Sequence, residues 1–171
     1  MYTMRNILSS AILAVAIGGA GFAGAQTSPG VWDARARVTL QAETGRIAAD
    51  RAEVVEQGSF ENQRGVSLKQ GVASQVGSPK TQPDLVFRIR APRPGRYWIH
   101  THAALDAKGA AVMREAAGKT GSLRMMISVS GSIPASRVVF VPWRSPESCI
   151  QAIGKYNLTG EEEDIRIWLP E

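Results

Sequence analysis

The chain has 171 residues, and its 20 Lys and Arg against 15 Asp and Glu give a formal net charge of +5. It contains a single cysteine, Cys149, which excludes a disulfide framework, and we expect this thiol to be buried. The basic residues are scattered and are not regularly interleaved with aromatic residues, as a nucleic-acid stacking surface would require, so we expect no nucleic-acid partner.

The first 25 residues have the parts of an export signal. Arg5 supplies a positive charge, residues 7–17 form a mainly apolar run, and the Ala-Gly-Ala of residues 23–25 matches the small-x-small cleavage pattern, which makes Gln26 the first mature residue. The apolar run is shorter than the roughly 20 residues that cross a bilayer core. The sequence therefore predicts a secreted or periplasmic protein that has no membrane association after signal cleavage.

The 146 residues that remain after removal of the first 25 are the size of one domain. We assign residues 26–37 to an N-terminal tail and residues 38–171 to the domain. Loss of Arg5 lowers the net charge to +4. A positive field of this size favours an acidic partner, such as an anionic polysaccharide, although an ordinary solvated surface has the same charge pattern.

Apolar and polar residues alternate along several segments, which is the pattern of a strand with one buried face. In residues 85–90, Leu85, Phe87 and Ile89 point one way and the two arginines point the other. Leu123, Met125 and Ile127 form a similar set, and we expect all six apolar residues in a shared core. The further strand candidates are residues 38–43, 52–56, 66–70, 97–103, 123–130, 138–141 and 165–169.

Turn residues separate these segments. Pro92-Arg93-Pro94-Gly95 predicts a tight connection between two strands. Residues 103–118 are rich in alanine and predict a long loop with one or two helical turns. About eight short strands with polar connections predict an all-β, antiparallel β-sandwich.

The order of these segments resembles carbohydrate-binding modules of families six and thirty-five. In their opening strand an Ala-Glu pair leads into a glycine and a second short strand, as in residues 38–43 followed by Gly45-Arg46-Ile47. The central hairpin of the family, with a Pro-Gly turn and an aromatic-rich second strand, is similar to residues 84–89 and 94–99. Residues 65–68 and 165–170 resemble the next segment and the penultimate strand.

The resemblance implies a galactose-binding-like jelly-roll fold, in a module that accompanies glycoside hydrolases and polysaccharide lyases. The family pattern continues through another strand after the position of Glu171. One interpretation of this difference is a sandwich that lacks its last strand, with a catalytic domain downstream of residue 171.

Glu43 is the best match to a family site residue, because the corresponding glutamate helps to bind a structural calcium ion. Calcium takes six to eight oxygen ligands, and one glutamate supplies far fewer. A glutamate at the surface or on an edge strand is the alternative.

His100 and His102 are two residues apart on a predicted strand, so their side chains share a face. The spacing can hold two metal ligands, but a third ligand is not evident, and we expect no zinc site. On a solvent-facing strand the two imidazoles could instead bond sugar hydroxyls.

Two aromatic–polar pairs are candidates for sugar binding, Trp143 with Arg144 and Tyr156 with Asn157, both predicted in loops. An aromatic ring can stack on the face of a sugar while the polar neighbour bonds its hydroxyls. Packing of the aromatic rings in the core is the alternative for each pair.

The chain has no motif of a catalytic site. Gly118-Lys119-Thr120 lacks the first glycine of a phosphate-binding loop, and no Ser lies in a Gly-x-Ser-x-Gly elbow. We therefore interpret the protein as a non-catalytic, secreted carbohydrate-binding module, accessory to a polysaccharide-degrading or cell-surface protein. The alternatives are a structural or protein-interaction domain, and the N-terminal fragment of a polysaccharide lyase.

Overall fold

The computed structural model describes residues 6–9, 38–56, 63–76, 78, 81–105, 122–129, 135–140 and 149–169. Within these ranges the protein is all-β, with two five-stranded antiparallel sheets and one short 3-10 helix, η1 (Ala42–Thr44). None of the described segments forms a helix long and apolar enough to span a membrane.

Sheet A has the strand order β3-β4-β1-β6-β9. Its strands are β1 (Asn6–Ser9), β3 (Ala52–Glu56), β4 (Arg64–Leu68), β6 (Gly95–Leu105) and β9 (Cys149–Leu158). Sheet B has the order β2-β5-β10-β7-β8. Its strands are β2 (Arg46–Ile47), β5 (Leu85–Arg90), β7 (Ser122–Val129), β8 (Ala135–Phe140) and β10 (Glu162–Trp168).

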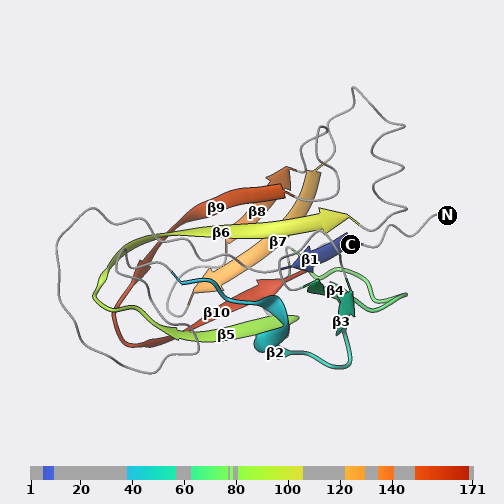
Figure 1. The fold of residues 1–171 in the computed structure, drawn as a ribbon, viewed down its shortest axis with the longest axis horizontal. Coiled ribbons are helices and arrows are strands. Elements are labelled where there is room, and N and C mark those ends of the chain that lie inside the picture. Colours follow the sequence, from blue (N-terminus) through green and yellow to red (C-terminus); the bar gives the residue numbers. More distant parts are fainter. Residues whose placement is uncertain are drawn as a thin grey trace.

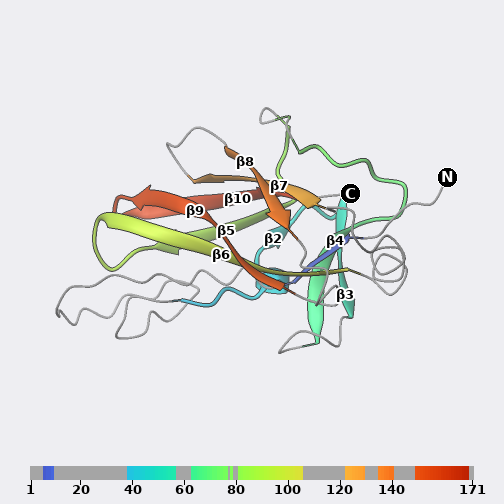
Figure 2. The ribbon, with the colours of Figure 1, turned by 90° about the horizontal axis from the view of Figure 1, so that it is seen from above.

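Two tight connections carry the chain from one sheet to the other. Residues 91–94 join β5 to β6, and residues 159–161 join β9 to β10, and both turns lie at the same end of the molecule (Figures 1 and 2). Gly160 has a φ of +85°, and a Cβ there would lie 3.1 Å from Pro94 Cδ. The Tyr97 hydroxyl donates to the Arg93 carbonyl at 2.8 Å. The two turns are therefore packed against each other, and the Tyr97 hydrogen bond joins the first of them to β6.

The inner faces of both sheets contribute to one hydrophobic core. Tyr97 and Ile99 of sheet A are buried in the same cluster as Phe87 and Ile165 of sheet B. The prediction that Leu85, Phe87, Ile89, Met125 and Ile127 share a core is confirmed, since each is at most 4% exposed. The side chain of Leu123, the sixth predicted member, lies outside the description.

Most predicted strands are confirmed, and residues 85–90 agree with β5 at both ends. Residues 38–43 do not form a strand, because the backbone N–H and side-chain hydroxyl of Thr44 both donate to the Gln41 carbonyl and turn the chain into η1. The prediction of a loop around Tyr156 and Asn157 is also wrong, because both residues belong to β9.

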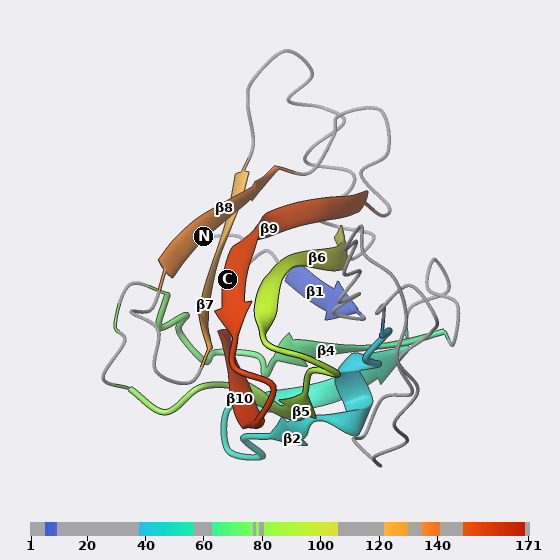
Figure 3. The same cartoon turned by 90° about the vertical axis from the view of Figure 1, so that its left-hand side faces the viewer.

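Strand β1 lies inside the segment predicted to be the export signal. It pairs with β4 through Ile7 opposite Ser67, and with β6 through Ile7 opposite Ala104. Figure 3 shows β1 between β6 and β4. Strands β4 and β6 do not pair with each other. The two halves of sheet A are therefore joined only through the hydrogen bonds of the four residues of β1, Asn6–Ser9.

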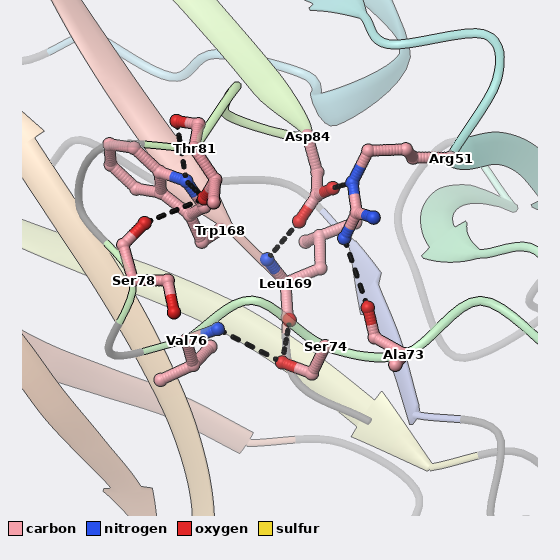
Figure 4. Close-up of polar contacts among 9 residues, drawn as sticks. All are labelled: Arg51, Ala73, Ser74, Val76, Ser78, Thr81, Asp84, Trp168 and Leu169. Carbon is pink, nitrogen blue, oxygen red and sulfur yellow. Dashed lines mark hydrogen bonds and ion pairs between the residues drawn. The ribbon is translucent and has the colours of Figure 1, made fainter.

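A buried carboxylate, Asp84, joins segments of both sheets (Figure 4). Asp84 is fully buried, and its Oδ1 accepts from Arg51 Nε at 2.6 Å while its Oδ2 accepts from Leu169 N at 2.8 Å. Its backbone also takes part, since Ala48 N donates to Asp84 O and Asp84 N donates to Ile167 O, each at 2.9 Å. Asp84 therefore fixes the start of β3, the start of β5 and the end of β10 relative to one another.

The connection between β4 and β5 covers the end of β10. Trp168 lies on the face of sheet B opposite the core, yet it is only 2% exposed. Its indole Nε1 donates to the Thr81 hydroxyl at 3.1 Å, and the Ser74 hydroxyl donates to the Leu169 carbonyl at 2.7 Å (Figure 4). Strand alternation alone would leave Trp168 exposed, but the connection between β4 and β5 covers it.

Replacement of Asp84 should destabilise the protein strongly. Asp84→Ala leaves the half-buried Arg51 guanidinium and the Leu169 N–H without their partner, and removal of one member of a buried pair costs roughly 3–5 kcal/mol. The free energy of unfolding from denaturant titration measures this loss. Glu161→Ala is the control, because Glu161 is 80% exposed beside Arg90 and should cost less than about 1 kcal/mol. Similar values for the two variants would contradict the role of Asp84.

Removal of residues 1–25 should weaken sheet A. A chain that starts at Gln26 has no β1, so the facing backbone groups of β4 and β6 lose their hydrogen bonds, each with a net value of about 1 kcal/mol. We expect the melting temperature to fall by roughly 5–10 °C relative to the full chain. Thermal unfolding and size-exclusion chromatography measure the loss and any new self-association at the open edges. An unchanged melting temperature would show that β1 contributes nothing to the folded domain.

Candidate functional site

The outer face of sheet A, opposite the core, has a row of polar and aromatic side chains at the paired strands β6 and β9. Along β6 the core-facing Tyr97, Ile99 and Thr101 are buried, and the residues between them are exposed or half-buried. We call the outward set the β6–β9 strip. It consists of Arg96, Trp98, His100 and His102 of β6 and Lys155 and Asn157 of β9.

Strand pairing brings these side chains together. Arg96 lies opposite Asn157, and Trp98 lies opposite Lys155. The Lys155 ammonium lies over the Trp98 ring, 4.7 Å from its centroid, which is a cation–π contact. The rings of Trp98 and His100 are 6.2 Å apart, and their planes are tilted by 49°. The strip therefore combines one large aromatic ring with donors and acceptors on both sides of it.

The two histidines of the strip are biased towards the neutral state. Partial burial lowers the pKa of both His100 and His102 below the ordinary value of about 6.5, because desolvation disfavours the charged imidazolium. A neutral imidazole has one donor nitrogen and one acceptor nitrogen. A sugar hydroxyl can likewise donate one hydrogen bond and accept others. At neutral pH both side chains can therefore exchange hydrogen bonds with hydroxyl groups.

The structure places the predicted site residues at several positions. His100, His102 and Asn157 share the face of the β6–β9 strip, with Asn157 opposite Arg96 at one end and His102 at the other end. Tyr156 faces the core at 7% exposure, opposite Tyr97, so it and Asn157 lie on opposite faces of β9. Trp143 and Arg144 lie outside the described residues.

Three strip residues were not predicted as site residues from the sequence, namely Arg96, Trp98 and Lys155. The alternation along β6 places Trp98 on the same face as His100 and His102, so that part of the strip could have been found from the sequence. The partner Lys155 could not, because its position depends on the register of β9, a strand that was not predicted.

Glu43 is half-buried in η1, within the described residues. No group of three or more His, Cys, Asp or Glu side chains there could hold a metal ion. The nearby carbonyls of Gln41 and Ala42 already accept hydrogen bonds from Thr44 and Gly45. Calcium at Glu43 stays a prediction, since the ion takes six to eight oxygen ligands and the Glu43 carboxylate supplies at most two of them.

The outer face of sheet B has a second feature, a cleft of about 340 Å³ that we call the arginine cleft. Its lining residues are Thr44, Gly45, Arg46, Val86, Phe87, Arg88 and Asp164. Arg88 Nε donates to Asp164 Oδ1 at 3.2 Å, and Arg166 Nη2 lies 3.7 Å from Asp164 Oδ2. One carboxylate thus lies between two guanidinium groups.

Comparisons with known proteins give no relative for this chain: no family model, no curated protein and no solved structure matches it. The resemblance to carbohydrate-binding modules is therefore supported only at the level of an all-β protein with antiparallel sheets.

The lowered pKa values of the two histidines predict that stability falls on mild acidification. Between the unfolded-state pKa near 6.5 and the lower folded-state pKa, the unfolded chain binds more protons, so the free energy of unfolding decreases as the pH falls through this window. Thermal unfolding between pH 7.5 and pH 5 measures the decline. The variant with His100→Gln and His102→Gln should lose part of it, and an identical decline in both proteins would contradict the assignment.

Proposed function

We propose that the protein binds a saccharide on the β6–β9 strip without catalysing a reaction, and that it prefers an acidic polysaccharide to a neutral one. The finer fold that we propose is a jelly-roll β-sandwich of the galactose-binding type, in a module that is exported. Cleavage after Ala25 would remove β1 and open sheet A between β4 and β6. The observation that carries the proposal is the half-buried Trp98, which lies on a sheet face between a cation and an imidazole.

An indole on a strand surface is suited to a pyranose ring. The apolar face of a sugar stacks on an aromatic ring, and water is excluded from both surfaces. The contact needs polar groups at the edge of the ring to fix the hydroxyls, and His100 and Asn157 are at hand on the same face. The strands hold all three side chains in place, so binding requires little ordering of the backbone.

The charges of the strip support the acidic preference. Arg96 and Lys155 are exposed on the face that presents Trp98. A guanidinium group matches a carboxylate with two parallel hydrogen bonds, and an ammonium group attracts it as a point charge. A uronate unit stacked near Trp98 would therefore meet two cations, whereas a neutral glucan would gain nothing from them.

Trp98→Ala should weaken polysaccharide binding and leave the fold intact. Loss of the stacking surface should reduce affinity about tenfold, which corresponds to about 1.4 kcal/mol, while Trp98→Phe should retain part of it. Affinity electrophoresis against alginate, pectate, heparin, xylan and a neutral glucan measures the effect. Circular dichroism checks the fold of each variant.

Lys155→Gln separates stacking from charge. The substitution uncovers one face of the Trp98 ring and removes a positive charge, so it should weaken binding of pectate or alginate while neutral glucan binding is unchanged or stronger. Absence of binding to every polysaccharide, or equal binding by Trp98→Ala and the parent protein, would favour a structural or protein-interaction domain instead.

A further inference from the structure

We infer that the arginine cleft on sheet B is a second binding site, which takes a single carboxylate group of a small acidic ligand through Arg46 and Arg88. The cleft belongs to the outer face of the other sheet and shares no residue with the β6–β9 strip. This inference therefore goes beyond the proposed function and does not depend on it.

Strand pairing places the cationic side chains around a shallow apolar floor. Arg46 of β2 lies opposite Val86 of β5, and Arg166 of β10 lies opposite Val86 on its other side. Val86 is 7% exposed, and the core-facing Phe87 contributes to the wall beside it. A ligand on this floor would have a guanidinium group on each side.

The guanidinium groups around the cleft are not fully neutralised. Among the described residues Arg46 has no side-chain hydrogen bond or ion pair, and Arg88 uses only its Nε, towards Asp164. A guanidinium group has five N–H donors, so most of the donors of these two residues are open to a ligand. The lining contains two arginines, Arg46 and Arg88, and one carboxylate, Asp164, which Arg166 also approaches. Guanidinium groups therefore outnumber carboxylates at the cleft.

Close packing of the backbone keeps the cleft open at Gly45. A Cβ at this position would lie 2.5 Å from Leu85 Cδ1, closer than real Cβ atoms approach, and 3.0 Å from Phe87 Cε1, which is a tight contact. Glycine therefore lets the segment from Thr44 to Arg46 lie directly on β5, which brings the Arg46 side chain to the same cleft as Arg88. A larger residue would require Leu85, Phe87 or the segment that carries Arg46 to shift.

The shape and chemistry of the cleft favour a carboxylate on a small ring. Its volume of about 340 Å³ is near the lower end of small-molecule sites. Two guanidinium forks can bond a planar carboxylate in a bidentate manner. A ring attached to that carboxylate can also cover the apolar floor at Val86, which a sulfate ion cannot do. The Asp164 carboxylate beside them can accept hydrogen bonds from hydroxyl groups of the same ligand.

Titration with sodium glucuronate, sodium sulfate and glucose tests the inference, with backbone amide NMR signals as the readout. We expect glucuronate to shift the signals of Thr44, Gly45 and Arg46 in a saturable manner, sulfate to shift them more weakly, and glucose to leave them unchanged. Arg46→Gln should weaken glucuronate binding about fivefold, as loss of one exposed charge pair does. Arg64→Gln, with the same charge change on sheet A, should bind as the parent does.

The Trp98→Ala variant separates this inference from the proposed function. It lacks the stacking ring of the strip but retains the cleft, so it should give the same glucuronate shifts at Gly45 and Arg46 as the parent. Equal shifts with sulfate and glucuronate would overturn the carboxylate assignment. Absence of saturable shifts at Gly45 and Arg46, or equal binding by Arg46→Gln and Arg64→Gln, would overturn the site itself.

Discussion

The buried carboxylate of Asp84 is the interaction on which the arrangement of the two sheets depends. A charged group with no solvent exposure is stable only when its oxygens are paired, and Arg51 and the Leu169 amide pair both of them. Arg51 precedes β3 in sheet A and Asp84 precedes β5 in sheet B, so their bond crosses between the sheets. The bond from Leu169, which follows β10, joins two neighbouring strands of sheet B. Arg51 also donates to the Ala73 carbonyl at 3.1 Å, which ties the segment over Trp168 to the same point. The polar network thus selects one arrangement of sheets that apolar packing alone would leave less defined.

That arrangement decides which side chains are available for binding. One face of each sheet packs in the common core. Every second residue of β5 and of β6 therefore points away from the core. On β6 these are Arg96, Trp98 and the two histidines, and on β5 they include Arg88 and Arg90. The β6–β9 strip and the arginine cleft are consequences of the same alternation on different sheets. Neither requires a special backbone geometry, apart from the close approach at Gly45.

The sequence predicted those parts of the fold in which local alternation is strong. Residues 85–90 were placed correctly because each second side chain is large and apolar, and the Pro-rich turn after them confirmed the end of the strand. The segment 149–158 was missed because Gly154 and a register shift near Ile99 interrupt its pattern. Residues 38–43 alternate well but form η1, since Thr44 bonds back to Gln41. Of the site residues, those on β6 follow from period two, whereas Lys155 depends on long-range pairing that no local pattern contains.

The distribution of charge connects the two surfaces. Arg96 and Lys155 are exposed on sheet A, and Arg46 and Arg88 are exposed on sheet B, whereas the acidic groups Asp84 and Glu163 are buried and bonded within the fold. Asp84 and Arg51 neutralise each other within the fold and contribute little to the field outside, so the cations open to a ligand among the described residues are those exposed on the two sheets. A long polyanion would encounter cations on either sheet. The aromatic ring of Trp98 and the apolar floor at Val86 would then distinguish a sugar acid from a simple anion, because only the sugar acid adds a ring face to its charge.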